Sequence, residues 1–141
     1  MKVNGIDHVG IVVPSLDAAS DWLRDKFLLT SEPELINAEQ GVCLRFIWVG
    51  ETRLEILEPS NPEGPLRRFL QRHPRGGLHH ISLAVESLHE AISHLTEHGV
   101  DLAGQLGLTA EGREMCFLRP SAPLGVLFEL EHHDDWHGGR S

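Results

Sequence analysis

The stretch Asp7-His8-Val9-Gly10-Ile11-Val12-Val13-Pro14-Ser15-Leu16 decides the fold, because a second copy of it follows later in the chain. The copy is His79-His80-Ile81-Ser82-Leu83-Ala84-Val85-Glu86-Ser87-Leu88, which begins 72 residues further on. A second pair of matching stretches, Arg53 to Leu57 and Leu127 to Glu131, lies two residues out of that register. Since self-similarity at a fixed spacing marks repeated structural units, the chain is interpreted as a duplication.

Each copy predicts a strand, then a helix, then further strands. The opening strands alternate in hydrophobicity, and Ser15 and Ser87 follow them as helix N-caps before an apolar helical stripe. Gly99 is expected to end the second helix. The predicted fold class is therefore α+β, with two tandem βαβββ modules.

Hairpins are expected in the later part of each module. One pairs Cys43 to Val49 with Arg53 to Leu57 around Gly50-Glu51, and the other pairs Glu114 to Leu118 with Val126 to Glu131. A turn-rich linker and a short helix over 66–71 separate the modules. The predicted organisation is one domain over 1–133, with modules at about 5–59 and 77–131, and a polar tail over 134–141.

Four polar residues occupy equivalent places in the two modules. His8 and His80 share a strand face with small residues, because successive side chains of a strand point to opposite faces. Glu55 and Glu129 each stand between two apolar neighbours that point away from them. If a pseudo-twofold axis relates the modules, the four side chains converge in one cleft. The alternative is that the histidines are ordinary strand residues and the glutamates lie on a solvated face.

Two imidazoles and two carboxylates form a mixed nitrogen and oxygen ligand set for one divalent metal ion. Such a set suits Co, Ni, Zn, Mn or Fe(II), and it is not a soft thiolate site. The metal prediction is preferred because all four residues recur in equivalent positions. Most of the ten histidines, including His132 and His133 near the C-terminus, are expected to be surface residues without a special role.

Composition excludes several classes of protein. With 141 residues and 40% hydrophobic content, the chain suits one domain. A net charge of −9 argues against a nucleic acid partner, because affinity there depends on neutralising phosphates. Apolar runs are too short for a membrane span, and no leader is expected, so a cytoplasmic protein is predicted. Cys43 and Cys116 are expected to be reduced core residues.

The chain resembles the vicinal-oxygen-chelate superfamily, which includes the glyoxalases and the bleomycin-resistance proteins, and within it most of all the methylmalonyl-CoA epimerases. The resemblance rests on the stretches Ile6 to Val13, Asn37 to Val42, Thr52 to Pro59, Gly77 to Ile81 and Gly125 to Leu130. It implies an incomplete barrel around the metal, a homodimer, and His8, Glu55, His80 and Glu129 as the metal ligands. One departure is Arg119-Pro120-Ser121-Ala122, where epimerases usually carry a lysine.

The resemblance implies epimerisation of a methylmalonyl-CoA-type thioester through an enolate. Glu39 is the expected base, through its place in the segment Asn37 to Val42; the plainer alternative is an exposed turn residue. Glu129 is the preferred second acid or base, with Glu111 as a less favoured choice at the repeat-equivalent position of Glu39. The substrate is expected to be an acyl-CoA, whose phosphates could bind a basic cluster formed by Arg67, Arg68, Arg72 and Arg75.

Three other functions share this fold. A glyoxalase I-like lactoylglutathione lyase keeps the same four ligands and differs in its substrate walls. A metal-free protein that sequesters a ligand generally lacks the four ligands, which this chain has. A metal-dependent dioxygenase typically uses two histidines and one glutamate, so Glu55 counts against it.

Overall fold

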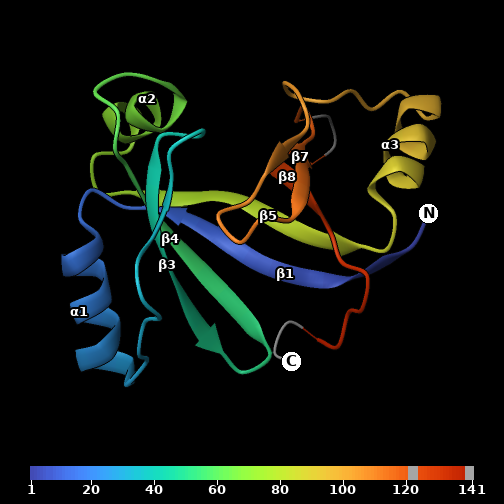
Figure 1. The fold of residues 1–141 in the computed structure, drawn as a ribbon. Coiled ribbons are helices and arrows are strands. Elements are labelled where there is room, and N and C mark those ends of the chain that lie inside the picture. The colour runs from blue at the N-terminus through green and yellow to red at the C-terminus, as the bar shows by residue number, and fades with distance from the viewer. Residues whose placement is uncertain (121–123, 139–141) are drawn as a thin grey trace. The chain divides into compact units, whose positions relative to one another are not determined.

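The computed structural model describes residues 1–120 and 124–138 and arranges them as a mixed α+β protein (Figure 1). The order of its elements is β-α-β-β-β, given twice with one helix between, which confirms the predicted tandem βαβββ modules. No helix among the described residues is long and apolar enough to span a membrane. The elements are β1 (Val3–Val12), α1 (Leu16–Phe27), β2 (Leu35–Asn37), β3 (Val42–Val49), β4 (Thr52–Pro59), α2 (Pro65–Arg72), β5 (Gly77–Val85), α3 (Leu88–Glu97), β6 (Gly107–Leu108), β7 (Glu114–Phe117) and β8 (Leu127–His132).

The chain divides into two compact units that do not coincide with the two modules. One unit is Val9–His79, in which β2, β3, β4 and β1 follow one another as hydrogen-bonded neighbours. The other unit is Met1–His8 together with His80–Ser141, in which the neighbours are β5, β8, β7 and β6. The first eight residues therefore belong with the second module.

In the unit Val9–His79, α1 begins where the sequence predicts. The Ser15 hydroxyl accepts a hydrogen bond from the backbone N–H of Ala18, as an N-cap does. The helix packs on a buried apolar cluster of Val13, Leu16, Ile47 and Ile56. The bulky face of β1 is thus covered by a helix, as its alternating pattern indicates.

In the other unit, α3 repeats this arrangement. Ser87 accepts from the backbone N–H of Glu90, and Gly99 follows the last turn with a φ of 79°. The cluster beneath the helix is Val85, Leu88, Ala91, Cys116, Leu118 and Leu130. Complete burial of one such Leu or Val side chain stabilises the fold by about 1.5–3 kcal/mol.

The strand register preserves the duplication around both glutamates. Glu55 on β4 lies opposite Phe46 on β3, and Glu129 on β8 lies opposite Phe117 on β7. On its other side Glu129 pairs with Ser82 of the parallel neighbour β5. Because residues two apart share a face, Glu129 and Glu131 lie on the same face of β8, opposite to Leu130.

Candidate metal centre

Three of the four predicted ligands converge within one unit. The Nε2 atoms of His8 and His80 are 3.0 Å apart, and the Glu129 carboxylate lies 3.6 Å from the first and 3.8 Å from the second. These donor atoms all lie within 4.8 Å of one another, and all three side chains are buried. The two imidazoles and one carboxylate form the donor set that borderline divalent metals prefer, so these residues fit such an ion.

Asp7 fixes the orientation of the His8 ring. Its Oδ2 lies 2.7 Å from Nδ1 of His8, and both residues are 1% exposed. An ionised carboxylate can only accept a hydrogen bond, so this contact favours the tautomer in which Nδ1 carries the proton and Nε2 presents its lone pair toward His80 and Glu129. A carboxylate behind a histidine in this way is the usual support for a metal-ligating imidazole.

His80 and Glu129 are supported differently. The ring of His80 meets that of Phe117 edge to face, with centroids 5.5 Å apart. The hydroxyl of Ser82 donates a hydrogen bond of 2.9 Å to Oε1 of Glu129. Ser82 is completely buried, so this bond replaces water at the carboxylate and orients its two oxygens.

Two predicted site residues lie in the unit Val9–His79. Glu55 is on β4 and is 8% exposed. Glu39 is exposed in the turn between β2 and β3, where the backbone N–H of Gly41 donates to the carbonyl of Ala38. Neither residue is among the three that converge in the other unit, so the fourth ligand and the base stay predictions.

Glu111, the less favoured acid, lies in a turn between β6 and β7. Its carboxylate is 3.3 Å from Nη1 of Arg113, and the same nitrogen lies 3.2 Å from Oε1 of Glu131. Glu111 is therefore held in an ion pair at the surface. Glu131, which the sequence analysis did not single out, is 1% exposed.

The prediction that His133 is a plain surface residue is wrong. The residue is 9% exposed, and its Nε2 lies 3.1 Å from Oδ1 of Asp7 and 3.3 Å from Oε1 of Glu131. Its position in a polar, Gly-rich C-terminal stretch gave no signal of burial. A signal was available in the period of two along β8, which places His133 on the same face as Glu129 and Glu131.

Comparisons with known proteins agree with this geometry. The sequence profile of the glyoxalase/bleomycin resistance protein/dioxygenase superfamily matches residues 7–117. The mitochondrial methylmalonyl-CoA epimerase of Mus musculus is 32% identical over 92% of this chain and 74% of its own length. The ethylmalonyl-CoA/methylmalonyl-CoA epimerase of Cereibacter sphaeroides is 33% identical over 92% of this chain and 98% of its own.

The chain belongs to this superfamily and, within it, to the methylmalonyl-CoA epimerases. Its fold agrees: a Streptomyces coelicolor methylmalonyl-CoA epimerase in complex with 2-nitronate-propionyl-CoA has a TM-score of 0.85 and 25% identity, covering 93% of this chain and 95% of that one. The predicted family and the predicted enzyme class, an epimerase-like isomerase, are confirmed.

The segment Arg119-Pro120-Ser121-Ala122, where the sequence departs from the epimerase pattern, lies only partly within the described residues. Arg119 donates from Nε to the carbonyl of Leu102 at 3.3 Å, whereas Ser121 and Ala122 lie outside the described residues. The effect of this departure on an epimerase substrate stays a prediction.

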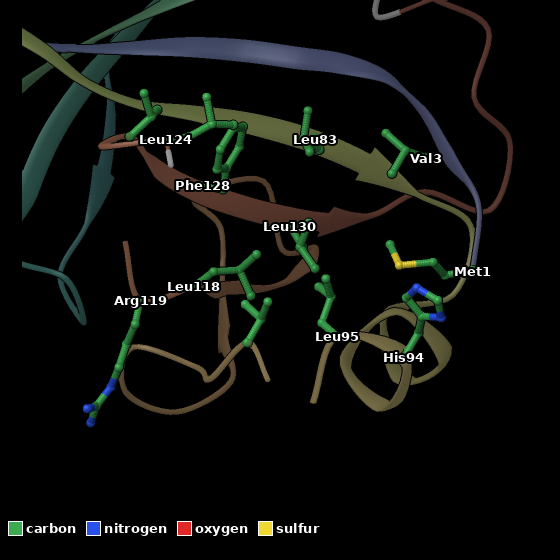
Figure 2. Close-up of a pocket in the computed structure, with 12 residues that line it drawn as sticks. Met1, Val3, Leu83, His94, Leu95, Leu118, Arg119, Leu124, Phe128 and Leu130 are labelled. Carbon is green, nitrogen blue, oxygen red and sulfur yellow. The ribbon is translucent and has the colours of Figure 1, made fainter. Parts of the chain in front are cut away.

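The unit with the candidate ligands also has an apolar pocket of about 390 Å³ (Figure 2). Leu83, Phe128 and Leu130 line it, and these residues alternate along β5 and β8 with His80 and Glu129. The pocket therefore opens on the opposite face of the strands from the candidate metal ligands.

Burial shifts the pKa values of His79 and Cys116, which lie outside the three convergent residues, in opposite directions. Burial lowers the pKa of His79 to about 4, so this ring is neutral at pH 7. Burial, followed by the charge of Glu129, raises the pKa of the Cys116 thiol to about 11. Cys43 and Cys116 are both free, and Cys116 is a buried core residue as predicted.

Proposed function

We propose that the protein is a metal-dependent epimerase of a 2-substituted malonyl-CoA-type thioester, with methylmalonyl-CoA as the expected substrate. The observation that supports this most is the convergence of His8, His80 and Glu129, with Asp7 behind His8. Relatives at 32% and 33% identity are named for the same reaction. Glu55 is the proposed fourth ligand, by its equivalence to Glu129.

The reaction needs a proton to leave the carbon between a thioester and a carboxylate and to return on the opposite face. Bound at His8, His80 and Glu129, a divalent ion such as Co, Ni, Zn or Mn would act as a Lewis acid toward the substrate oxygens. The ligand used in the Streptomyces coelicolor complex supports an enolate, since a nitronate is a planar, resonance-stabilised anion of similar charge distribution.

The chain's own residues have the following proposed roles. Glu39 removes the α-proton, and its exposure on the turn before β3 leaves its carboxylate able to accept one. Glu129 takes up a proton from solvent and returns it on the other face, and the hydrogen bond from Ser82 holds its Oε1 so that Oε2 is the oxygen available for this transfer. A pair of carboxyl groups acting from opposite faces is the simplest arrangement for inverting one carbon.

The CoA part of the substrate requires cations for its phosphates. Arg67 is already engaged, since its guanidinium donates to the carbonyls of Pro59 and Asn61. Arg68, Arg72 and Arg75 are exposed on and just after α2, so they are the proposed phosphate contacts. A homodimer and a cytoplasmic location also remain predictions.

Deuterium wash-in tests the function. The purified protein is stripped of metal, reloaded with cobalt and incubated in D2O with (2R)- or (2S)-methylmalonyl-CoA. We expect exchange at the α-carbon that requires cobalt and falls by roughly 100-fold or more in Glu39→Gln, in line with the loss of a general base.

Metal analysis of His80→Ala is the matching control, and we expect it to lose stoichiometric cobalt. Full metal content in that variant, or exchange that persists without metal, would contradict the proposal. Turnover of a glutathione hemithioacetal without exchange of methylmalonyl-CoA would point to the lyase instead.

A further inference from the structure

A second buried polar cluster lies directly behind the candidate ligand His8. It consists of Asp7, Glu131 and His133, which are 1%, 1% and 9% exposed. All three belong to the same unit as His8, His80 and Glu129. Buried charges of this kind are costly unless they are paired, so the arrangement of the cluster needs an explanation.

Asp7 joins this cluster to the candidate metal ligand. One carboxylate oxygen, Oδ2, lies 2.7 Å from Nδ1 of His8, and the other, Oδ1, lies 3.1 Å from Nε2 of His133. Each oxygen of Asp7 thus faces one imidazole. A rotation of the Asp7 carboxylate would break both contacts together, so His133 restricts the orientation that His8 depends on.

The cluster contains cations as well as carboxylates. His133 lies against Asp7 and Glu131, and Arg113, which also pairs with Glu111, lies against Glu131. Burial lowers the pKa of His133, but its contacts with Asp7 and Glu131 outweigh this and raise the pKa to about 9. A metal ion in the cluster would have to displace a proton from His133 and tolerate Arg113, which disfavours a second metal site.

Packing holds His133 in place from the C-terminal side. The ring of Trp136 meets the ring of His133 edge to face, with centroids 5.0 Å apart. Trp136 also lies against Gly5, where an added Cβ atom would come within 2.9 Å of the indole nitrogen. The chain after β8 is therefore anchored on β1 beside Asp7.

We propose that His133 is a positioning residue for the metal centre: it holds Asp7, and Asp7 holds His8 with Nε2 toward the metal. This proposal rests on the proposed function, because it assumes that His8 is a ligand. It assigns a role to the chain after β8, which contains none of the predicted ligands. His133 itself touches neither metal nor substrate.

A pocket gives experimental access to this position. It has a volume of about 360 Å³ and is lined by the turn before β7, by the first residue of β7, and by the chain at and after the end of β8, with Arg113 and His133 among the lining residues. Removing the His133 side chain would extend this pocket toward Asp7. Free imidazole is small enough to enter and restore the lost contact.

The test compares His133→Ala with His132→Ala, a neighbour whose ring contacts the exposed Asp134 at 2.9 Å. Cobalt affinity is measured by competition with a chromophoric chelator, with and without imidazole. We expect His133→Ala to bind cobalt on the order of tenfold more weakly and imidazole to restore much of the loss, while His132→Ala stays near wild type. His133→Gln, which keeps a donor at this place, is expected to fall between the two and guards against misfolding of the alanine variant.

A second readout does not require bound metal. Nitrogen NMR of the His8 ring in metal-free protein should show one dominant tautomer, protonated at Nδ1, in wild type and a mixture in His133→Ala. Unchanged cobalt affinity and an unchanged tautomer in His133→Ala would overturn the proposal. Loss of a second equivalent of cobalt in that variant would also overturn it, because His133 would then be a ligand. A third outcome separates the two proposals. If wild type binds no cobalt but the His8 tautomer still differs between wild type and His133→Ala, the proposed function is rejected and the positioning role is retained.

Discussion

The two modules present equivalent histidines with different support. His8 follows Asp7, whose carboxylate contacts the His8 ring at 2.7 Å, whereas His80 follows His79 at the repeat-equivalent place. The ring of His79 packs edge to face on Phe69, with centroids 5.4 Å apart, and the ring of His80 meets that of Phe117. The duplication has preserved the two histidines while their neighbours diverged, so a carboxylate contacts Nδ1 of His8 and an aromatic ring packs on His80.

The largest effect on cobalt affinity is expected when the carboxylate that supports His8 is removed. Asp7→Asn removes the charge that orients His8 and balances His133, so we expect cobalt affinity to fall by roughly 10–100-fold. His79→Asn, the equivalent change in the other module, should alter the affinity by less than about threefold, because the ring of His79 packs on Phe69. The affinity is measured by chelator competition. Equal losses in the two variants would show that the supports are not as different as their contacts indicate.

A smaller effect is expected at the glutamates. Ser82 donates to Glu129, but its repeat-equivalent is Gly10, which has no side chain to donate. Ser82→Ala should weaken cobalt binding by about fivefold, since one hydrogen bond is worth about 1 kcal/mol.

Ser20→Ala is a suitable control for that change. Ser20 is buried in the other unit and accepts a hydrogen bond from Arg45, so its loss should affect stability and leave cobalt affinity unchanged. An affinity for Ser82→Ala equal to that of wild type would mean that Glu129 needs no such support.

The smallest effect concerns the ends of the two equivalent helices. The residue directly after α1 is Leu28, with a φ of 58° and 87% exposure, whereas the left-handed residue after α3 is Gly99, which follows the C-cap His98 and has a φ of 79°. A left-handed conformation destabilises the folded state by about 1–2 kcal/mol for a residue with a Cβ atom. Glycine avoids this cost, but part of the gain is lost because glycine makes the unfolded chain more flexible. Leu28→Gly should therefore raise the free energy of unfolding by about 0.5–1 kcal/mol.

Urea denaturation measures this difference, with Gly99→Ala as the reverse change. We expect Gly99→Ala to destabilise the protein by about 1 kcal/mol, because it places a Cβ in the left-handed region. If Leu28→Gly destabilises the protein instead, the exposed leucine side chain makes a contribution that outweighs its backbone strain.

The sequence was sufficient to predict the modules and three convergent residues because both rest on local periodicity. Alternation along β1, β5 and β8 places His8, His80 and Glu129 on one face, and the serine caps mark where α1 and α3 begin. The support around these residues was not predictable, because it depends on which distant segments pack together. Asp7 and His133 lie far apart in the chain, and no pattern within either segment indicates their contact.

Glu39 and Glu55 show that local patterns also do not reveal whether a predicted site residue lies near the others. Their assignment came from resemblance and from equivalence within the repeat, and each lies in a unit separate from the three convergent ligands. A local pattern can state which face of a strand a carboxylate occupies. It cannot state what that face meets, because this depends on contacts between segments distant in sequence.

The unit that contains His8 draws on both ends of the chain, and this affects how the protein can be made. A nascent chain leaving the ribosome presents His8 early, but Glu129 and His133 emerge more than 100 residues later. Until then Asp7 and His8 lack their buried partners. The first part of β1, up to His8, has no compact unit to pack into, because it belongs to the unit formed with residues after His80. Splitting the gene in the linker before α2 would therefore leave neither fragment with a complete binding cluster, although each would encode one whole βαβββ repeat.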